Sequence, residues 1–189
     1  NHYLKLTAKE NMDLFAAFYP NKELFKLEDL FEMVGLEDSI NKKVEAYSKG
    51  MKMRLNFIRA IMHDPDIIFF DEPTAGLDPV NARKIREHIL ALKQRGKTIF
   101  ITTHNVTAAD ELCDRVAFIA DGELLVTESP ATLKHKHGRE AVKVELKNGQ
   151  SEEFPLTSLG QNGAFSSFLN QGELLRINTL EATLEEVFI

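Results

Sequence analysis

The feature that most constrains the fold is a short apolar run that ends in two carboxylates. Residues Ile67–Phe70 are all apolar, and Asp71 and Glu72 follow directly. A run with no polar position is typical of a strand buried on both faces, as in the parallel sheets of α/β proteins. Because ligands bind at the carboxyl edge of such sheets, we expect a ligand site at the two carboxylates. The alternative is a strand that simply runs into an acidic turn.

A helix and a second apolar strand follow the first strand. Residues Pro79–Leu92 are expected to be helical, with Pro79 near the first turn and Gly96 just after the last. Residues Thr98–Thr102 form the second apolar run. The alternation of strand and helix predicts a parallel sheet with crossover helices.

The first third of the chain is predicted to be helical. Thr7 and Glu10 have the spacing of a capping box at a helix start. The helix that follows is expected to present one apolar face, made by Leu14, Phe15 and Phe18. Two more helices are expected over residues 21–34 and 48–62, the latter ending before Asp64-Pro65.

The last third is predicted to hold short strands and helices. Asp121-Gly122 indicates the turn of a hairpin, and Asn148-Gly149 indicates a second tight turn. From about Arg139 the pattern becomes that of a small α+β appendage, because Val142, Val144 and Leu146 alternate with polar residues. Its remaining elements are expected to be a helix at 165–169, a strand at 174–177 and a final helix at 184–188.

Composition excludes several classes of protein. The 189 residues are 43% hydrophobic and 28% charged, as in ordinary globular domains. No apolar run approaches the length that crosses a bilayer, so we expect membrane association to depend on a partner. The single cysteine, Cys113, excludes an internal disulfide and suits a cytoplasmic protein. A net charge of -6 without a long basic run disfavours nucleic acid as the main partner.

Three ordered motifs resemble those of the ATP-binding domains of ABC transporters. Residues Asp71–Pro79 (DEPTAGLDP) are similar to the Walker B and D-loop segment of that family, nearly residue for residue. Residues Tyr47–Arg54 (YSKGMKMR) resemble its signature, and Thr102–His104 resembles its H-loop. The resemblance is strong over residues 4–128 and looser in the tail, chiefly through residues 182–188. It implies an α/β, P-loop NTPase-like parallel sheet with a helical subdomain and a small C-terminal α+β appendage.

The resemblance also implies the chemistry of the two carboxylates. Asp71 would hold Mg²⁺ through water, and Glu72 would polarise the water that attacks ATP. His104, at the end of the next strand, would contact the γ-phosphate. Phosphoryl transfer needs both a carboxylate for Mg²⁺ and a group that orients the attacking water.

The signature departs from the commonest Leu-Ser-Gly-Gly-Gln form. Ser48 and Gly50 are retained, Lys49 replaces the first glycine, and Met51 stands where glutamine is usual. A serine hydroxyl and free N–H groups at a helix start form an anion site. By resemblance, Ser48, Gly50 and Met51 would face ATP held by a second ATPase domain, and Asp78 would reach across that dimer. Lys49 either adds a positive charge there or is merely exposed to solvent.

The phosphate loop of the family is not found in the sequence. Residues 91–98 (ALKQRGKT) fit a relaxed form of its pattern, but we expect them to close a helix and open a strand. A real phosphate loop does the reverse. Residues 1–7 resemble the segment just after the family's Q-loop, which implies that the phosphate loop would precede them. We therefore expect the 189-residue chain alone neither to bind ATP tightly nor to hydrolyse it, and to expose apolar surface.

The favoured interpretation is the ATP-hydrolysing subunit of an ABC exporter. Residues 7–63 would dock on a separate transmembrane permease, and the subunit would lie in the cytoplasm on the inner face of the membrane. We expect a helical subdomain at 1–64, the second half of the ATPase core at 65–138, and the appendage at 139–189. Two alternatives stay open: an ABC ATPase that acts on ribosomes or DNA, and a non-catalytic ABC-like binding module.

Overall fold

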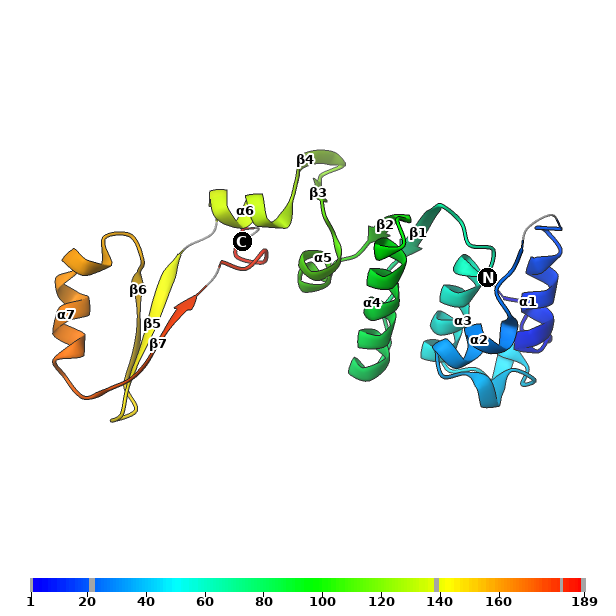
Figure 1. Cartoon of the computed structure of the whole chain (residues 1–189), viewed down its shortest axis with the longest axis horizontal. Helices are drawn as coiled ribbons and strands as arrows, with labels where there is room; N and C mark the ends of the chain where they lie inside the picture. Colours follow the sequence, from blue (N-terminus) through cyan, green and yellow to red (C-terminus); the bar gives the residue numbers. More distant parts are fainter. Residues whose placement is uncertain (1, 21–22, 138–139, 181, 188–189) are drawn as a thin grey trace. The chain divides into compact units, whose positions relative to one another are not determined.

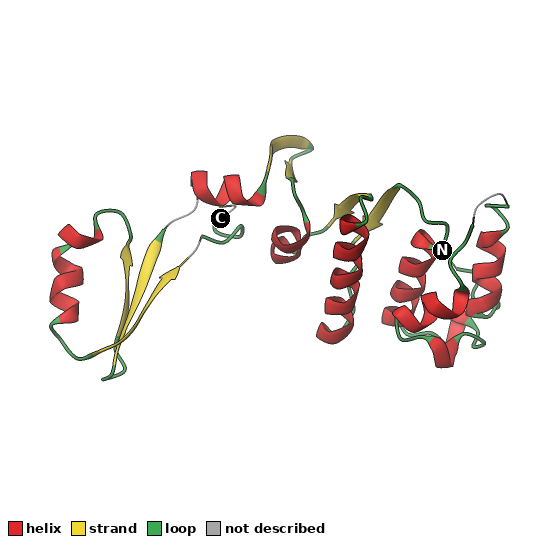
Figure 2. Cartoon of the chain, in the orientation of Figure 1, coloured by secondary structure: helices red, strands yellow, loops and turns green. Residues whose placement is uncertain are grey.

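The computed structural model describes residues 2–20, 23–137, 140–180 and 182–187 (Figures 1 and 2). The chain divides into two compact units, Asn1–Ala108 and Ala109–Ile189, and each is considered by itself. Both helices and strands are present, so the α/β class expected from the sequence is confirmed. The division into three parts stays a prediction.

The first unit begins with three packed helices. They are α1 (Ala8–Ala16), α2 (Leu27–Met33) and α3 (Lys49–Ile61), with short 3-10 turns at Glu37–Ser39 and Val44–Ala46. The predicted capping box is confirmed, because Thr7 and Glu10 exchange hydrogen bonds at the start of α1. The start of α3 is also as predicted, with Ser48 as its N-cap. Phe31, Leu55 and Ile58 are fully buried in the core between the helices.

Two details of the helical region differ from the prediction. The buried side of α1 is made by Ala8, Asn11 and Met12, whereas Phe18 lies beyond the helix end and is 70% exposed. Helix α2 begins at Leu27 rather than near residue 21; residues 21–22 lie outside the described part. The reason is a tertiary contact, since the Phe25 N–H donates to the Met62 carbonyl and holds this segment away from helical geometry.

The strand pair follows the helices. Strands β1 (Ile67–Asp71) and β2 (Thr98–Thr102) are parallel, with Asp71 opposite Thr102. Helix α4 (Pro79–Gln94) makes the crossover, and α5 (Val106–Leu112) follows β2. The predicted parallel pairing is therefore confirmed.

The predicted burial of both faces of β1 is wrong for the described residues. Ile68 and Phe70 are buried, and the Phe70 ring stacks on Phe57 of α3 with ring centroids 5.1 Å apart. Phe69 points to the other face, where it is 73% exposed and stacks on Phe100, which is 56% exposed. The sheet has one covered face and one open aromatic face, which agrees with the apolar exposure expected from the sequence.

The second unit starts with a hairpin. Strands β3 (Val116–Ala120) and β4 (Glu123–Glu128) pair antiparallel, and α6 (Pro130–His137) follows. Asp121 and Gly122 both have positive φ, 53° and 80°, as a tight hairpin turn requires. The hairpin predicted from these two residues is confirmed.

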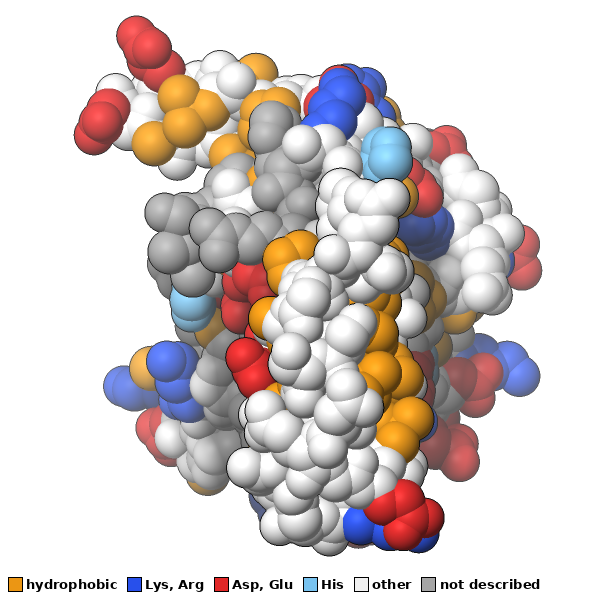
Figure 3. Space-filling model, turned by 90° about the vertical axis from the view of Figure 1, so that its left-hand side faces the viewer, with side chains coloured by type: hydrophobic (Ala, Val, Ile, Leu, Met, Phe, Trp, Pro, Cys, Tyr) orange, Lys and Arg blue, Asp and Glu red, His pale blue; other side chains and the backbone are white. Residues whose placement is uncertain are grey.

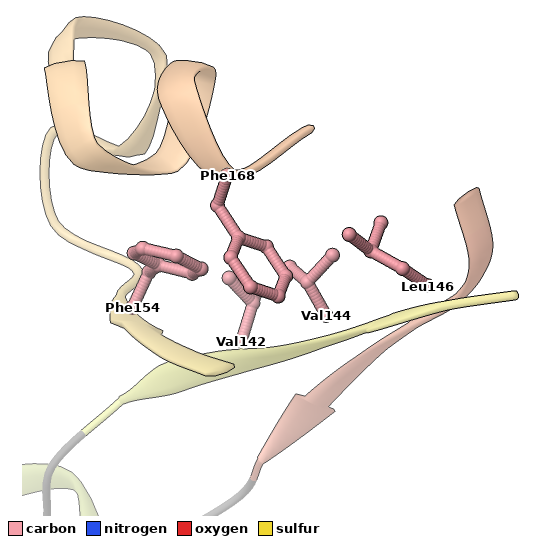
Figure 4. Close-up of a cluster of buried hydrophobic side chains, with 5 residues drawn as sticks. All are labelled: Val142, Val144, Leu146, Phe154 and Phe168. Carbon is pink, nitrogen blue, oxygen red and sulfur yellow. The ribbon is translucent and has the colours of Figure 1, made fainter. Parts of the chain in front are cut away.

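The appendage is a three-stranded antiparallel sheet with a helix on one face. The strand order is β6 (Ser151–Pro155), β5 (Ala141–Leu146), β7 (Leu174–Leu180), and α7 (Gly163–Leu169) lies over the sheet. Figure 4 shows the buried side chains that join them: Val142, Val144, Leu146, Phe154 and Phe168. The alternation seen in the sequence of β5 thus places its apolar residues under α7. A final helix is not found, because residues 184–187 form turns and Phe188 lies outside the described part.

The surface of the appendage is mixed. Viewed from the α7 side, hydrophobic side chains lie exposed beside charged ones (Figure 3). Leu174, Leu175 and Ile177 of the edge strand β7 are 44–57% exposed. Within the described ranges, none of the helices combines the length and hydrophobicity that a bilayer crossing requires.

Candidate functional site

The two candidate carboxylates lie at the carboxyl end of the parallel pair. Asp71 is the last residue of β1, and the Thr102 hydroxyl on the neighbouring strand donates to its Oδ1. The pairing continues for one residue, since the Glu72 N–H donates to the Thr102 carbonyl at 2.9 Å. The backbone of β2 therefore fixes where both acids leave the strand.

Glu72 and His104 are in direct contact. Oε1 of Glu72 accepts from the backbone N–H of His104 and from its ring Nδ1, both at 2.8 Å. Oε2 accepts from the Thr103 hydroxyl at 3.2 Å. Glu72 also has a left-handed backbone, with φ 47°, which is uncommon outside glycine and is typical of strained functional positions. The structure thus joins two residues that the sequence singled out separately.

These contacts determine the charge of the site. Burial raises the pKa of Glu72, but the hydrogen bonds from His104 and Thr103 outweigh it and leave the pKa below its usual value. Glu72 is therefore ionised at neutral pH and can only accept hydrogen bonds. It follows that Nδ1 of His104 carries the proton, so Nε2 is the nitrogen available to a ligand on a side chain that is 85% exposed.

The signature residues form the first turn of α3. The Ser48 Oγ accepts from the Met51 N–H at 3.2 Å, and the first turn holds no acidic residue. A methyl group placed on Gly50 would lie 3.3 Å from Leu77 Cδ2 and 3.5 Å from the Gly76 carbonyl oxygen. The start of α3 consequently lies directly against the turn that follows Glu72.

Asp78 has a local partner that the sequence interpretation missed. It is the N-cap of α4, where its Oδ1 accepts from the N–H groups of Val80 and Asn81, both at 3.1 Å. Its Oδ2 accepts from the Asn81 side chain at 2.6 Å, and this hydrogen bond is the main reason that the Asp78 pKa is lowered. An aspartate directly before Pro79 was the available signal, because Asp at N-cap and Pro at N1 are both favoured.

The residues present fit a magnesium ion bound with substrate. Mg²⁺ is held in such sites by one or two carboxylates, completed by water and substrate phosphates. Asp71 offers an exposed carboxylate at the strand end, oriented by Thr102. In the part of the chain that is described, no group of three or more His, Cys, Asp or Glu side chains forms a metal site by itself. The hydroxyls of Thr102 and Thr103 hydrogen-bond to the two acids. Thr102 lies opposite Asp71 in the register, and Thr103 follows directly after β2.

Comparison with known proteins gives a consistent result. The family model described as "ABC transporter" matches residues 2–75. A fluoroquinolones export ATP-binding protein of Mycobacterium tuberculosis is 46% identical over 193 residues, which cover 100% of this chain and 64% of that protein. The bacitracin transport ATP-binding protein BcrA of Bacillus licheniformis is 31% identical over 210 residues, which cover 99% of this chain and 68% of BcrA.

A solved structure agrees with the sequence relatives. The structure of an ATP binding subunit of an ABC transporter aligns with a TM-score of 0.64 at 26% identity, covering 71% of this chain and 57% of that one. The chain thus spans about two thirds of the length of the curated relatives that match it end to end.

Proposed function

Because the chain belongs to the family of ABC transporter ATP-binding proteins, we propose that it acts in ATP hydrolysis as part of an exporter. The observation that carries this proposal is the Glu72–His104 contact beside Asp71, at the carboxyl end of the parallel pair. A non-catalytic module has no need of an ionised glutamate held in a left-handed conformation at this edge.

In the proposed reaction each of the three residues has one task. A Mg²⁺ ion bound through water to Asp71 would neutralise charge on the phosphates. Glu72 is ionised and accepts a hydrogen bond from the attacking water, which orients it toward the γ-phosphate. His104 is oriented by Glu72 through Nδ1, so that its Nε2 would face a γ-phosphate oxygen.

We propose that the signature turn acts on a nucleotide held by a second ATPase domain. Ser48, Gly50 and the N-terminal N–H groups of α3 offer donors to a γ-phosphate, and the α3 dipole favours the negative charge. The backbone N–H of Met51 donates to the Ser48 Oγ, so Met51 would contribute to this site by holding the Ser48 side chain in place. Asp78 would contact the opposite domain after giving up its hydrogen bonds to Val80 and Asn81 at the start of α4.

The proposed partner is a transmembrane permease. Apolar side chains of the helical region reach the surface around α1: Tyr3 57%, Leu4 50%, Leu14 37% and Phe18 70% exposed. Such a surface fits a protein partner. We therefore propose that the subunit lies on the cytoplasmic face of the membrane, bound through the permease, with no nucleic acid partner. The relatives' names, which refer to export of fluoroquinolones and transport of bacitracin, favour an exporter.

We also propose that the 189-residue chain by itself does not bind ATP tightly. Residues 91–98 close α4 and open β2, and Gly96 has φ 83°, so this segment is not a phosphate loop. Titration of the chain with MgATP in a calorimeter should give no tight binding.

The test of the proposed function is hydrolysis by the subunit expressed from its complete gene. Glu72→Gln should lower kcat by roughly 10²–10⁴-fold, the usual contribution of a positioned base, while MgATP still binds. Glu153→Gln, on the exposed face of β6, is the matched control and should hydrolyse ATP at the wild-type rate. Wild-type activity in Glu72→Gln would contradict the assignment, and an inactive wild type would favour a non-catalytic module.

A further inference from the structure

Lys49 lies across the turn that follows the catalytic carboxylate. A methyl group placed on Gly76 would come within 3.2 Å of both Cδ and Cε of Lys49 and within 3.5 Å of its Nζ. Gly76 has φ 74°, a conformation in which side chains are strained, so the turn itself requires glycine here. Because Gly76 has no side chain, the aliphatic part of Lys49 can pack directly over the backbone of the turn.

This contact is one of two between the same pair of turns. Gly50, the next residue of α3, lies against Leu77 and the Gly76 carbonyl, as described above. The first turn of α3 and the turn at residues 74–77 are therefore packed together at two adjacent points, one on Gly76 and one on Leu77. In both contacts the nearest atom is a carbon, Cδ2 of Leu77 in one and Cδ or Cε of Lys49 in the other, so close fit contributes to their strength.

The turn under Lys49 connects directly to Glu72. The Ala75 N–H donates to the Glu72 carbonyl at 3.0 Å, and the Leu77 N–H donates to the Thr74 carbonyl at 3.3 Å. Beyond the turn, Asp78 caps α4. Gly76 is thereby linked to the backbone of Glu72 through two hydrogen-bonded turns.

Charge does not explain why a lysine occupies this place. A cation in the first turn of a helix opposes the helix dipole, and α3 has no acidic residue in that turn. The side-chain atoms nearest to Gly76 are instead the methylenes Cδ and Cε, with Nζ slightly farther away. Lysine side chains commonly cover neighbouring surface with the stem while the ammonium stays in water.

We infer that Lys49 is a positioning residue whose aliphatic stem ties the start of α3 to the turn after Glu72. The inference rests on the proposed function, in which α3 meets a phosphate and Glu72 orients water. In that function, a movement of the signature turn would be passed to the turn that follows Glu72. Lys49 would make these two turns move together.

The first test measures the contact without any nucleotide. Hydrogen exchange of the Ala75 and Leu77 amides is compared in the 189-residue chain and in Lys49→Ala, Lys49→Met and Lys52→Ala. Lys49→Ala should exchange these amides roughly three- to tenfold faster, the scale of one or two lost methylene contacts. Lys49→Met keeps the stem and should match the wild type, as should Lys52→Ala on the same helix.

The second test measures hydrolysis by the subunit expressed from its complete gene. Lys49→Ala should lower kcat by roughly ten- to a hundredfold through misplaced groups, with KM for ATP little changed, and Lys49→Met should restore kcat. Unchanged exchange in Lys49→Ala, or a kcat equal to that of the wild type, would overturn the inference. Equal loss in Lys49→Met would also overturn it, because charge would then be responsible. If the wild type hydrolyses no ATP, the proposed function fails while the exchange result still decides the contact.

Discussion

The helical region α1–α3 and the strand pair β1–β2 belong to the same unit but bury their apolar side chains differently. In the helical region Phe31 and Leu55 are 0% exposed. In the strand pair Phe69 and Phe100 are 73% and 56% exposed, although they too are large and apolar. The helices cover one another, whereas the sheet has two faces and is covered by α3 on one of them.

The difference shows which parts of the candidate site are held in place by a packed core and which by hydrogen bonds. The signature turn is carried by a helix whose core is complete, so its geometry is set by contacts within the helical region. The carboxylates are carried by a strand whose other face is open. Their positions depend instead on the hydrogen bonds of Asp71 and Glu72 to the end of β2.

The largest expected effect on stability is in the helical region. Leu55→Ala removes a fully buried side chain from α3 and should lower the free energy of unfolding by about 2–5 kcal/mol. Urea unfolding followed by far-UV circular dichroism measures the change. Phe69→Ala is the matched comparison and should cost only about 0.5–1.5 kcal/mol, the value of its stacking on Phe100. Equal costs would show that the two regions are not packed differently.

A smaller effect is expected at the start of α1. Thr7→Ala removes the hydroxyl that accepts from the Glu10 N–H and donates to the Glu10 carboxylate, while the bond from the Thr7 backbone N–H stays. The loss should cost about 1 kcal/mol, measured in the same urea titration. Thr7→Ser keeps a hydroxyl that can accept from the Glu10 N–H and should stay close to the wild type. A Thr7→Ala protein as stable as the wild type would mean that the helical region does not depend on this cap.

Substitutions on the exposed face of β1 should change the self-association of the chain more than its free energy of unfolding. Phe69→Lys places a charge on the exposed aromatic face and should reduce self-association of the 189-residue chain, as measured by sedimentation velocity over a range of concentrations. Leu14→Lys on the helical region is the comparison, since Leu14 is less exposed at 37%. A wild-type chain that is monodisperse at high concentration would remove the basis for this prediction.

The smallest expected effect is the pH dependence at Glu72. The pKa of Glu72 is lower in the folded chain than its usual value of 4.5. Its hydrogen bonds therefore stabilise the fold above that value, and the contribution is lost as the pH falls through the folded pKa. The difference in unfolding free energy between wild type and Glu72→Gln should be under about 1 kcal/mol at pH 7 and should vanish in acid. A difference that grows in acid would have the wrong sign.

Much of the fold follows from local patterns in the sequence. The capping box at Thr7, the turn at Asp121-Gly122 and the alternation in β5 depend on neighbours along the chain, and each is found in the structure. The start of α2 was missed because it depends on a hydrogen bond between Phe25 and Met62, far apart in sequence. The open side of Phe69 was missed because an all-apolar run does not say which faces find a cover.

The site shows the same division. The order of Asp71, Glu72 and His104 at two strand ends was sufficient to expect them at one sheet edge. Their contact through Oε1, the left-handed backbone of Glu72 and the packing of Lys49 on Gly76 are tertiary features without a sequence pattern.

The segment before α1 is tied to the helical region by hydrogen bonds at both Tyr3 and Leu4. Asn11, which is 1% exposed, accepts from the Tyr3 N–H and donates to the Tyr3 carbonyl, at 2.8 and 3.0 Å. The Leu4 carbonyl accepts from the Glu45 N–H at 2.9 Å, only three residues before Ser48. Tyr3 and Leu4 are therefore held by hydrogen bonds to α1 and to the segment just before the signature turn.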